Sequence, residues 1–187
     1  DNTFLTPIYQ KPLRHGADVV LYSLTKYAGG HSDLVAGAAI GGRAALAPIR
    51  QLRSTIGTQI DPHTAWLLTR SLETFALRVE RAHDNARRIA QFLEQHPQVT
   101  RVNFLGLLDP ASPAGRVYFE QCTGAGSTMC FSIRGGEAEA FRFLDALTIA
   151  KLAVSLGGTE TLACHPASTT HSGIAKADRD RLGIPIN

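Results

Sequence analysis

The stretch from Gly16 to Gly41 reads GADVVLYSLTKYAGGHSDLVAGAAIG and contains two apolar runs separated by a polar, glycine-broken segment. The first run, residues 17–22, is almost continuously apolar, which is typical of a strand buried on both faces of a parallel sheet. The second run, residues 34–40, ends at a pair of glycines and predicts another strand. We place residues 23–33 in a loop at the end of the first strand. Because open α/β sheets usually bind ligands at the carboxyl ends of their strands, this loop is the first candidate for a functional site.

Beyond this loop the pattern changes to a long helical region followed by a smaller unit. From Pro62 to Leu93 apolar residues recur every three or four positions, which predicts amphipathic helix with a proline in its first turn. After Pro97, short strand patterns alternate with helical ones, as in an α+β unit. The strands are expected at residues 99–103, 128–133 and 152–156, and the helices at 113–122 and 137–147. We therefore predict two parts, residues 1–75 and 76–187.

The composition is that of an ordinary globular protein, with 44% hydrophobic and 19% charged residues among 187. No run of about 18 apolar residues is present, and the first ten residues lack a signal-peptide pattern, so we expect a cytoplasmic protein without a membrane partner. Basic and acidic side chains alternate along residues 78–88, which predicts a solvated helix face and no nucleic-acid partner. The cysteines Cys122, Cys130 and Cys164 form no C-x-x-C pair, so we expect reduced thiols in the core.

The first residues of the loop, Ser23-Leu-Thr-Lys26, combine a lysine with two hydroxyl groups. A deprotonated lysine amine forms a covalent imine with an aldehyde. The hydroxyls of Ser23 and Thr25 can donate hydrogen bonds to a phosphate, and the carboxylate of Asp1 can hold a proton on a pyridine nitrogen. These are the groups that a protein contributes to pyridoxal phosphate chemistry. Serine, threonine and lysine are also common in surface turns, so the four residues alone do not exclude a plain loop.

Several motifs, in order, resemble the pyridoxal-phosphate enzymes of cysteine and methionine metabolism, the trans-sulfuration family. They are Asp1-Asn-Thr, Ser23-x-Thr-Lys26-Tyr, Gly30-His-Ser-Asp33, Ser155-Leu-Gly-Gly-x-Glu160 and His165-Pro-Ala-x-x-Thr170-His171. Two positions depart from the family pattern, Leu24 and Ala28. The resemblance implies an α/β fold: the C-terminal part of a fold type I, aspartate aminotransferase-like major domain, followed by a smaller and incomplete α+β domain. It also implies a homotetramer built from two dimers.

The resemblance assigns a role to each candidate cofactor residue. It implies that pyridoxal 5'-phosphate is the cofactor, that Lys26 forms the covalent imine with it, and that Asp1 pairs with the pyridine nitrogen. It implies further that Ser23 and Thr25 hold the cofactor phosphate. No metal site is expected, because the histidines have no acid or thiol in ligand register.

On the substrate side, the resemblance implies roles for Ser155, Val154 and Thr170. Ser155 matches a position whose backbone helps receive the substrate carboxylate and the lysine amine, and Thr170 lies near that carboxylate. Family members that handle cystathionine commonly have glutamate where this chain has Val154. An apolar side chain there suits the thioether of methionine better than a charged distal group.

We therefore expect a methionine γ-lyase-like carbon–sulfur lyase that converts methionine to methanethiol, ammonia and 2-oxobutanoate. Cystathionine γ-synthase, cystathionine γ-lyase and O-acyl-homoserine sulfhydrylase activities stay open, as does a non-catalytic module with the same fold. Tyr22-x-x-x-Lys26 also matches the active pair of short-chain dehydrogenases, but that pair requires a helix and Tyr22 ends a strand pattern.

Family members also use residues that have no counterpart here. They are a ring-stacking tyrosine, a glycine-rich phosphate loop, a tyrosine and an arginine from a partner subunit, and a C-terminal arginine for the substrate carboxylate. We expect the chain to be an internal segment of a longer enzyme and to be inactive in isolation.

Overall fold

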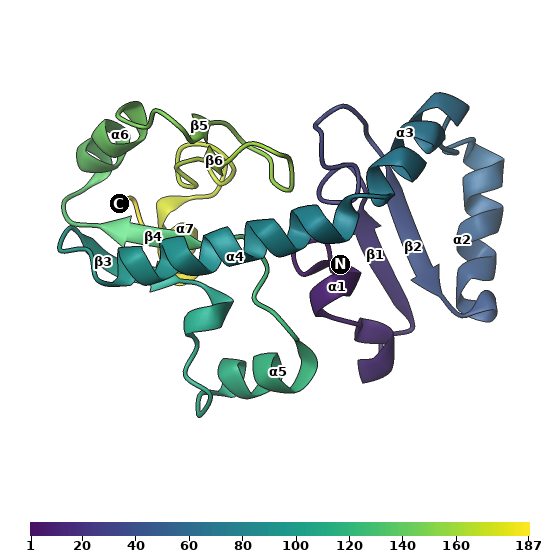
Figure 1. Cartoon of the computed structure of the whole chain (residues 1–187), viewed down its shortest axis with the longest axis horizontal. Helices are drawn as coiled ribbons and strands as arrows, with labels where there is room; N and C mark the ends of the chain where they lie inside the picture. The colour runs from purple at the N-terminus through teal and green to yellow at the C-terminus, as the bar shows by residue number, and fades with distance from the viewer.

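The computed structural model describes all residues, 1–187, as a mixed α/β structure in which one long helix, α4 (Phe75–Glu94), runs between two groups of elements (Figure 1). The group before α4 comprises α1 (Thr6–Tyr9), a 3-10 turn (Pro12–His15), β1 (Val19–Ser23), β2 (Gly37–Gly41), α2 (Arg43–Ile56) and α3 (Pro62–Leu72). The group after it comprises β3 (Val99–Asn103), a 3-10 turn (Leu105–Leu107), α5 (Pro113–Gln121), β4 (Cys130–Ile133), α6 (Glu137–Asp145), β5 (Lys151–Leu152), β6 (Leu162–Ala163) and α7 (Lys176–Arg181).

Strands β1 and β2 pair with each other, but the predicted parallel sheet is wrong. The two strands are antiparallel, with Val20 opposite Ile40. Residues 24–36 fold back on themselves, because the Thr25 N–H donates to the carbonyl of Ala36 at 3.2 Å and so starts the return of the chain. The pair is also not covered on both faces, since Val20 is buried while Leu21 is 48% exposed.

The helical region differs from the sequence prediction in two ways. Helix α2 was not predicted; it contains Pro48, and none of its residues is buried. The helix predicted from Pro62 begins there, with Asp61 as N-cap, but it ends at Leu72. Glu73 and Thr74 then interrupt the helix before α4 begins, so the apolar stripe spans two helices rather than one.

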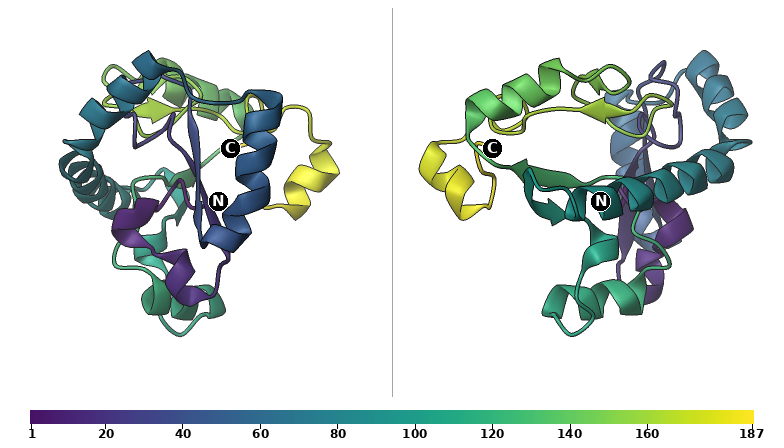
Figure 2. Two further views of the ribbon diagram at one scale, coloured as in Figure 1. Left: turned by 90° about the vertical axis from the view of Figure 1, so that its right-hand side faces the viewer. Right: turned by 60° about the vertical axis from the view of Figure 1, so that its left-hand side comes forward.

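The elements after α4 largely match the predicted strands and helices. Strand β3 has the predicted bounds and pairs antiparallel with β4. Helix α4 packs on this two-stranded sheet (Figure 2), and its residues Ala86 and Ala90 form a buried cluster with Phe104 and Ala125. The predicted strand at 152–156 is wrong, because only its first residue belongs to β5, which pairs in parallel with β6, and the rest forms a loop.

The predicted burial of the three cysteines is wrong in part. Cys130 is exposed, whereas Cys122 and Cys164 are partly buried, and all three are free thiols. Cys130 is the first residue of β4 and lies opposite Asn103 at the end of β3. Burial raises the pKa of the Cys122 thiol.

The two groups of elements meet at the first residues of the chain. Tyr9, Tyr27 and Val79 form a second buried cluster, and the Thr123 N–H donates to the carbonyl of Tyr9 at 2.8 Å. The predicted division between residues 1–75 and 76–187 falls at the start of α4 and stays a prediction. None of the helices is both long enough and apolar enough to cross a bilayer.

Candidate functional site

Lys26 lies in a tight turn that directly follows β1. The Lys26 N–H donates to the carbonyl of Ser23 at 3.2 Å, and the N–H groups of Gly29 and Gly30 donate to the carbonyls of Leu24 and Lys26 at 2.7 Å each. These overlapping bonds make residues 23–30 a hydrogen-bonded turn, which we call the lysine turn. A hydrogen-bonded turn of this kind fixes the backbone position from which the Lys26 side chain extends.

The lysine amine meets a residue from the far end of the chain. The Lys26 Nζ donates a hydrogen bond to the Ser155 Oγ at 3.0 Å, across 129 positions of sequence. No carboxylate pairs with this amine; the three ion pairs of the structure lie on other residues. The structure thus brings together two of the predicted site residues and leaves the amine with only a neutral partner.

The loop that carries Ser155 approaches the lysine turn as closely as backbone atoms allow. Gly157 adopts φ +80°, and a Cβ placed on it would lie 2.5 Å from the Tyr27 nitrogen and 2.9 Å from the Lys26 carbonyl carbon. Figure 1 shows the segment after β5 reaching across above α4 toward the β1–β2 side. Glycine is therefore required at 157 both for the conformation and for the contact.

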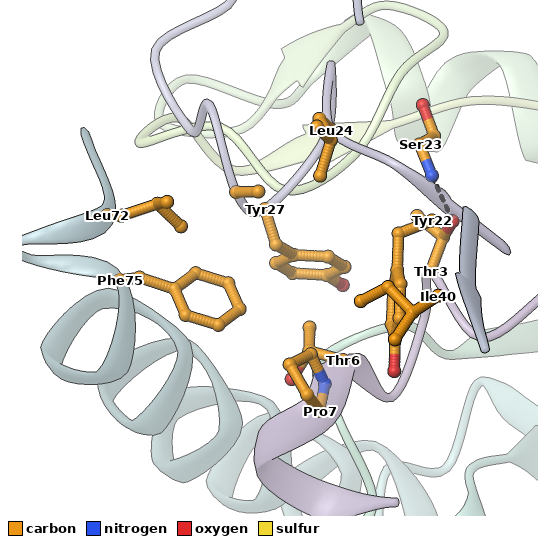
Figure 3. Close-up of a pocket in the computed structure, with 11 residues that line it drawn as sticks. Thr3, Thr6, Pro7, Tyr22, Ser23, Leu24, Tyr27, Ile40, Leu72 and Phe75 are labelled. Carbon is orange, nitrogen blue, oxygen red and sulfur yellow. Dashed lines mark hydrogen bonds between the residues drawn. The ribbon is translucent and has the colours of Figure 1, made fainter. Parts of the chain in front are cut away.

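The two predicted phosphate-binding hydroxyls differ in availability. The Ser23 N–H donates to the Thr3 Oγ1 at 2.8 Å, while its hydroxyl makes no hydrogen bond within the chain and points away from the other side chains in Figure 3. The Thr25 hydroxyl donates to the Ala36 carbonyl at 3.3 Å and accepts from the Ala36 N–H at 3.0 Å. Ser23 is ready to donate to an anion, whereas Thr25 would first have to release a long bond to Ala36.

Asp1 is held beside the same strand. Its Oδ1 accepts from the Thr3 N–H at 2.8 Å, and the Asn2 N–H donates to the carbonyl of Leu21 in β1 at 2.9 Å. The buried side chain of Asn2 adds bonds to Tyr22 and to the carbonyls of residues 6 and 10. These anchors fix the exposed Asp1 carboxylate along the strand that ends at the lysine turn.

The remaining predicted substrate residues occupy the C-terminal loops. Val154 precedes Ser155 and is 57% exposed, so it is not strand packing. The exposed Thr170 hydroxyl is bonded to the His171 Nδ1 at 2.8 Å and makes no hydrogen bond to Lys26 or Ser155. Val154 is thus next in sequence to the partner of the lysine amine, and no hydrogen bond connects Thr170 to that amine.

Two hollows adjoin the lysine turn. One is an open, mostly polar hollow of about 560 Å³, lined by Thr25, Ser32, Asp33, Leu34, Val35, Asp61, Thr64 and Ser155. The other is an apolar cavity of about 210 Å³ lined by the far side of the turn, including Leu24 and Tyr27, together with Phe75 (Figure 3). Neither lining includes Lys26, but only the polar hollow includes Ser155, the partner of its amine. The polar hollow is lined by Thr25 and Ser155, whereas Ser23 lines the apolar cavity, so the predicted site residues are divided between the two hollows.

Sequence reasoning missed two residues that hold the lysine turn. Tyr27 is buried, and its hydroxyl bonds to the Ser127 Oγ at 2.8 Å and the Thr128 Oγ1 at 3.1 Å. Arg78 was predicted to be on a solvated face, but its Nη1 donates to the Tyr27 carbonyl at 2.8 Å, and burial lowers its pKa. The position of Tyr27 next to Lys26 was a usable signal, whereas Arg78 is one of several arginines on its helix.

The available groups fit pyridoxal phosphate. The Lys26 amine has no charged partner that would compete for it, the Ser23 hydroxyl is an unused donor for a phosphate, and the Asp1 carboxylate is open to a ring nitrogen. A lysine, a hydroxyl donor and a carboxylate are the groups that a protein contributes to a lysine-anchored aldehyde cofactor.

Comparisons with known proteins identify the family of the chain. A profile of the family described as Cys/Met metabolism PLP-dependent enzyme matches residues 1–187. The L-methionine gamma-lyase of Fusobacterium nucleatum subsp. polymorphum is 40% identical over 186 residues, which are 98% of this chain and 47% of that protein. The cystathionine gamma-lyase of Sus scrofa is 41% identical over 185 residues, 98% of this chain and 45% of that protein.

The same likeness holds in three dimensions. The crystal structure of cystathionine gamma synthase from Xanthomonas oryzae pv. oryzae superposes with a TM-score of 0.92 at 40% identity, covering 100% of this chain and 48% of that one. The chain belongs to the Cys/Met metabolism PLP-dependent enzyme family. It spans about half the length of the curated relatives it matches.

Proposed function

We propose that these residues serve a pyridoxal-phosphate-dependent carbon–sulfur lyase that acts on methionine, with release of methanethiol, ammonia and 2-oxobutanoate. The observation that supports the proposal most directly is the 3.0 Å contact between the Lys26 Nζ and the Ser155 Oγ, with the exposed side chain of Val154 beside it. It joins the candidate cofactor anchor to the candidate substrate loop.

Each residue then has a defined task. Pyridoxal phosphate, when bound, supplies an aldehyde that bonds to an amine and a ring that accepts an electron pair. The amine of Lys26 removes the proton from the substrate Cα, and the Ser155 hydroxyl orients that amine. The Asp1 carboxylate keeps a proton on the ring nitrogen, and the Ser23 hydroxyl donates to the phosphate. Together these residues would hold both ends of the cofactor and remove the Cα proton. A second proton, from Cβ, must also leave before methanethiol departs, and one water is consumed in the release of ammonia.

The preference for methionine rests on the side chain of Val154. A charged distal group near this apolar residue would lose hydration without gaining a partner. A thioether carries no charge and has little hydration to lose. Relatives of both kinds match at about the same identity, 40% for a methionine gamma-lyase and 41% for a cystathionine gamma-lyase. Identity alone therefore does not favour either substrate.

A second candidate, action on cystathionine, has one observation in its favour. The polar hollow that includes Ser155 is also lined by Asp33 and Asp61, two carboxylates that suit the distal ammonium of cystathionine. Asp61 is already committed to capping α3, where its Oδ1 accepts from the N–H groups of His63 and Thr64 at 3.0 Å each. The Oδ2 of Asp61 is not used in this cap, so Asp33 and the second oxygen of Asp61 are both available to a ligand.

The test compares substrates on the full-length protein that carries these residues. Purified protein is supplied with pyridoxal phosphate and then with methionine, cystathionine, or an O-acyl-homoserine plus sulfide, and 2-oxobutanoate and thiol products are measured. We expect the highest kcat/KM with methionine. Equal or higher kcat/KM with cystathionine would end the methionine assignment, and faster formation of homocysteine from the ester would favour the sulfhydrylase. A protein that stays colourless with excess cofactor would favour the non-catalytic module. Residues 1–187 alone are expected to show no turnover.

A further inference from the structure

Arg78 uses its guanidinium to hold the open end of the lysine turn. Its Nη1 donates to the Tyr27 carbonyl at 2.8 Å, and its Nη2 donates to the Ala28 carbonyl at 3.3 Å. The last carbonyls of a hydrogen-bonded turn have no partner within the turn, so an arginine placed there acts as a cap. The cap belongs to the same turn that presents Lys26.

The other donors of Arg78 tie this cap to the junction between α3 and α4. Its Nη2 also donates to the Ser71 carbonyl at 2.9 Å, and its Nε donates to the Thr74 Oγ1 at 3.1 Å. Ser71 lies in the last turn of α3 and is buried. The guanidinium therefore joins the lysine turn to the break between the two helices, and its planar fork can reach both at once.

Two features show that this position is built for a guanidinium. Arg78 has no carboxylate partner among the ion pairs of the structure, so its contacts go to carbonyl and hydroxyl oxygens. Gly30 has φ +70°, and a Cβ on it would overlap the Arg78 guanidinium. A side chain at residue 30 would thus displace the cap.

The geometry points to Arg78 as a positioning residue for Lys26: it fixes the end of the lysine turn so that the amine stays within reach of the Ser155 hydroxyl. This role rests on the proposed function, because a fixed amine matters only if Lys26 is the cofactor anchor. Arg78 itself touches neither Lys26 Nζ nor the residues proposed to contact substrate.

The experiment uses the full-length protein with Arg78→Met, Arg78→Lys and Thr74→Val. Arg81→Met is the matched control, because Arg81 lies on the same helix, is exposed and makes no hydrogen bond in the structure. The first readout is amide hydrogen exchange in the cofactor-free protein at Gly29 and Gly30, whose N–H groups close the lysine turn. The second is the affinity for pyridoxal phosphate, followed by absorbance, together with kcat and KM.

We expect Arg78→Met to speed exchange at these two amides by about tenfold or more, since charge-assisted hydrogen bonds to the turn are lost. Cofactor affinity and kcat should fall by a similar factor while KM for the amino acid stays within about twofold. Arg78→Lys should recover part of each loss. Thr74→Val removes the partner of Nε together with the 3.4 Å hydrogen bond from the Thr74 Oγ1 to the Ser71 carbonyl, and it should give a smaller change in the same direction. Arg81→Met should change none of them.

Local exchange separates a positioning role from general stabilisation. If Arg78→Met lowers the melting temperature but leaves exchange at Gly29 and Gly30 equal to that of Arg81→Met, the proposal is overturned. If Arg78→Met does not fold, unchanged exchange in both Arg78→Lys and Thr74→Val overturns it. A wild-type protein that binds no cofactor would refute the proposed function, while the exchange experiment would still decide whether Arg78 holds the turn.

Discussion

Replacing Gly157 with alanine tests the close approach between the Ser155 loop and the lysine turn. Gly157 has φ +80°, and the new Cβ would lie 2.5 Å from the Tyr27 nitrogen and 2.9 Å from the Lys26 carbonyl carbon. Both neighbours are backbone atoms of a hydrogen-bonded turn, so they cannot rotate away as a side chain could. The loop, which is held by the exposed Ser155 hydrogen bond and by the packing of Leu156 against the cluster of Tyr9, Tyr27 and Val79, is the part that must move.

The size of the effect follows from two contributions. An alanine in the left-handed region costs about 1 kcal/mol relative to glycine. Forcing an extra methyl group against a packed neighbour adds roughly 1–3 kcal/mol, part of which is relieved if the loop shifts outward. We expect Gly157→Ala to lower the free energy of unfolding by about 2–4 kcal/mol, or by less if the loop gives way and the Lys26–Ser155 hydrogen bond is lost.

The matched control is Gly57→Ala. Gly57 follows α2 with φ +74° and has no atom within 4 Å of an added Cβ, so it carries the conformational cost without the contact. Urea unfolding of the full-length protein measures both variants, and hydrogen exchange at residues 155–158 reports the loop. Cofactor affinity is measured on the same samples, and we expect it to fall for Gly157→Ala only.

The proposed contact is contradicted if the two variants lose the same amount of stability and leave the loop unchanged. Equal losses of stability, with unchanged exchange in the loop and unchanged cofactor affinity, would mean that Gly157 does not touch the lysine turn. A loss of stability without a change in affinity would keep the contact but remove its link to the chemistry of Lys26.

Three further predictions address the substrate loop and the buried cluster. Ser155→Ala should lower kcat by about tenfold or more while changing the urea midpoint little, because the lost bond is exposed; full activity would remove the hydroxyl from the mechanism. Val154→Glu should raise the kcat/KM for cystathionine relative to that for methionine by about fivefold, which corresponds to one partly exposed ion pair. An unchanged ratio would mean that Val154 has no role in specificity. Burial, with the nearby Glu80 and Asp84, raises the pKa of Tyr9 from 10.0 to about 12. The stability that its protonated form contributes is therefore complete below pH 10 and lost as the pH rises toward 12. Over this interval the free energy of unfolding of wild type, measured in urea, should fall by about 1–2 kcal/mol more than that of Tyr9→Phe. Parallel curves of unfolding free energy against pH would contradict this prediction.

Local sequence signals were enough to predict the type and position of several elements. Strand β3 and helices α5 and α6 lie close to where the sequence pattern predicted them, and helix α5 begins at Pro113 with Ser112 as its N-cap. The turn around Lys26 was predicted as a loop after β1 because glycines and hydroxyls at residues 23–33 cannot continue an apolar strand. In each case the signal lies within the segment itself.

Features that depend on distant partners could not be predicted in this way. An apolar run such as residues 17–22 does not specify whether its neighbour is parallel, and the antiparallel pairing follows from how Thr25 and Ala36 close the connection. Helix α2 was missed although Leu46, Ile49 and Leu52 recur at helical spacing, because Pro48 and the lack of burial weaken that signal. The approach of the Ser155 loop to the lysine turn exists only in the folded chain.

The most direct test of the cofactor assignment is reduction of the full-length protein with borohydride after addition of pyridoxal phosphate, followed by peptide mass spectrometry. The assignment predicts that the yellow absorbance is bleached and that the cofactor mass is fixed to the peptide containing Lys26. Labelling of Lys11, Lys151, Lys176 or a lysine elsewhere in the protein instead of Lys26, or no labelling at all, would contradict it.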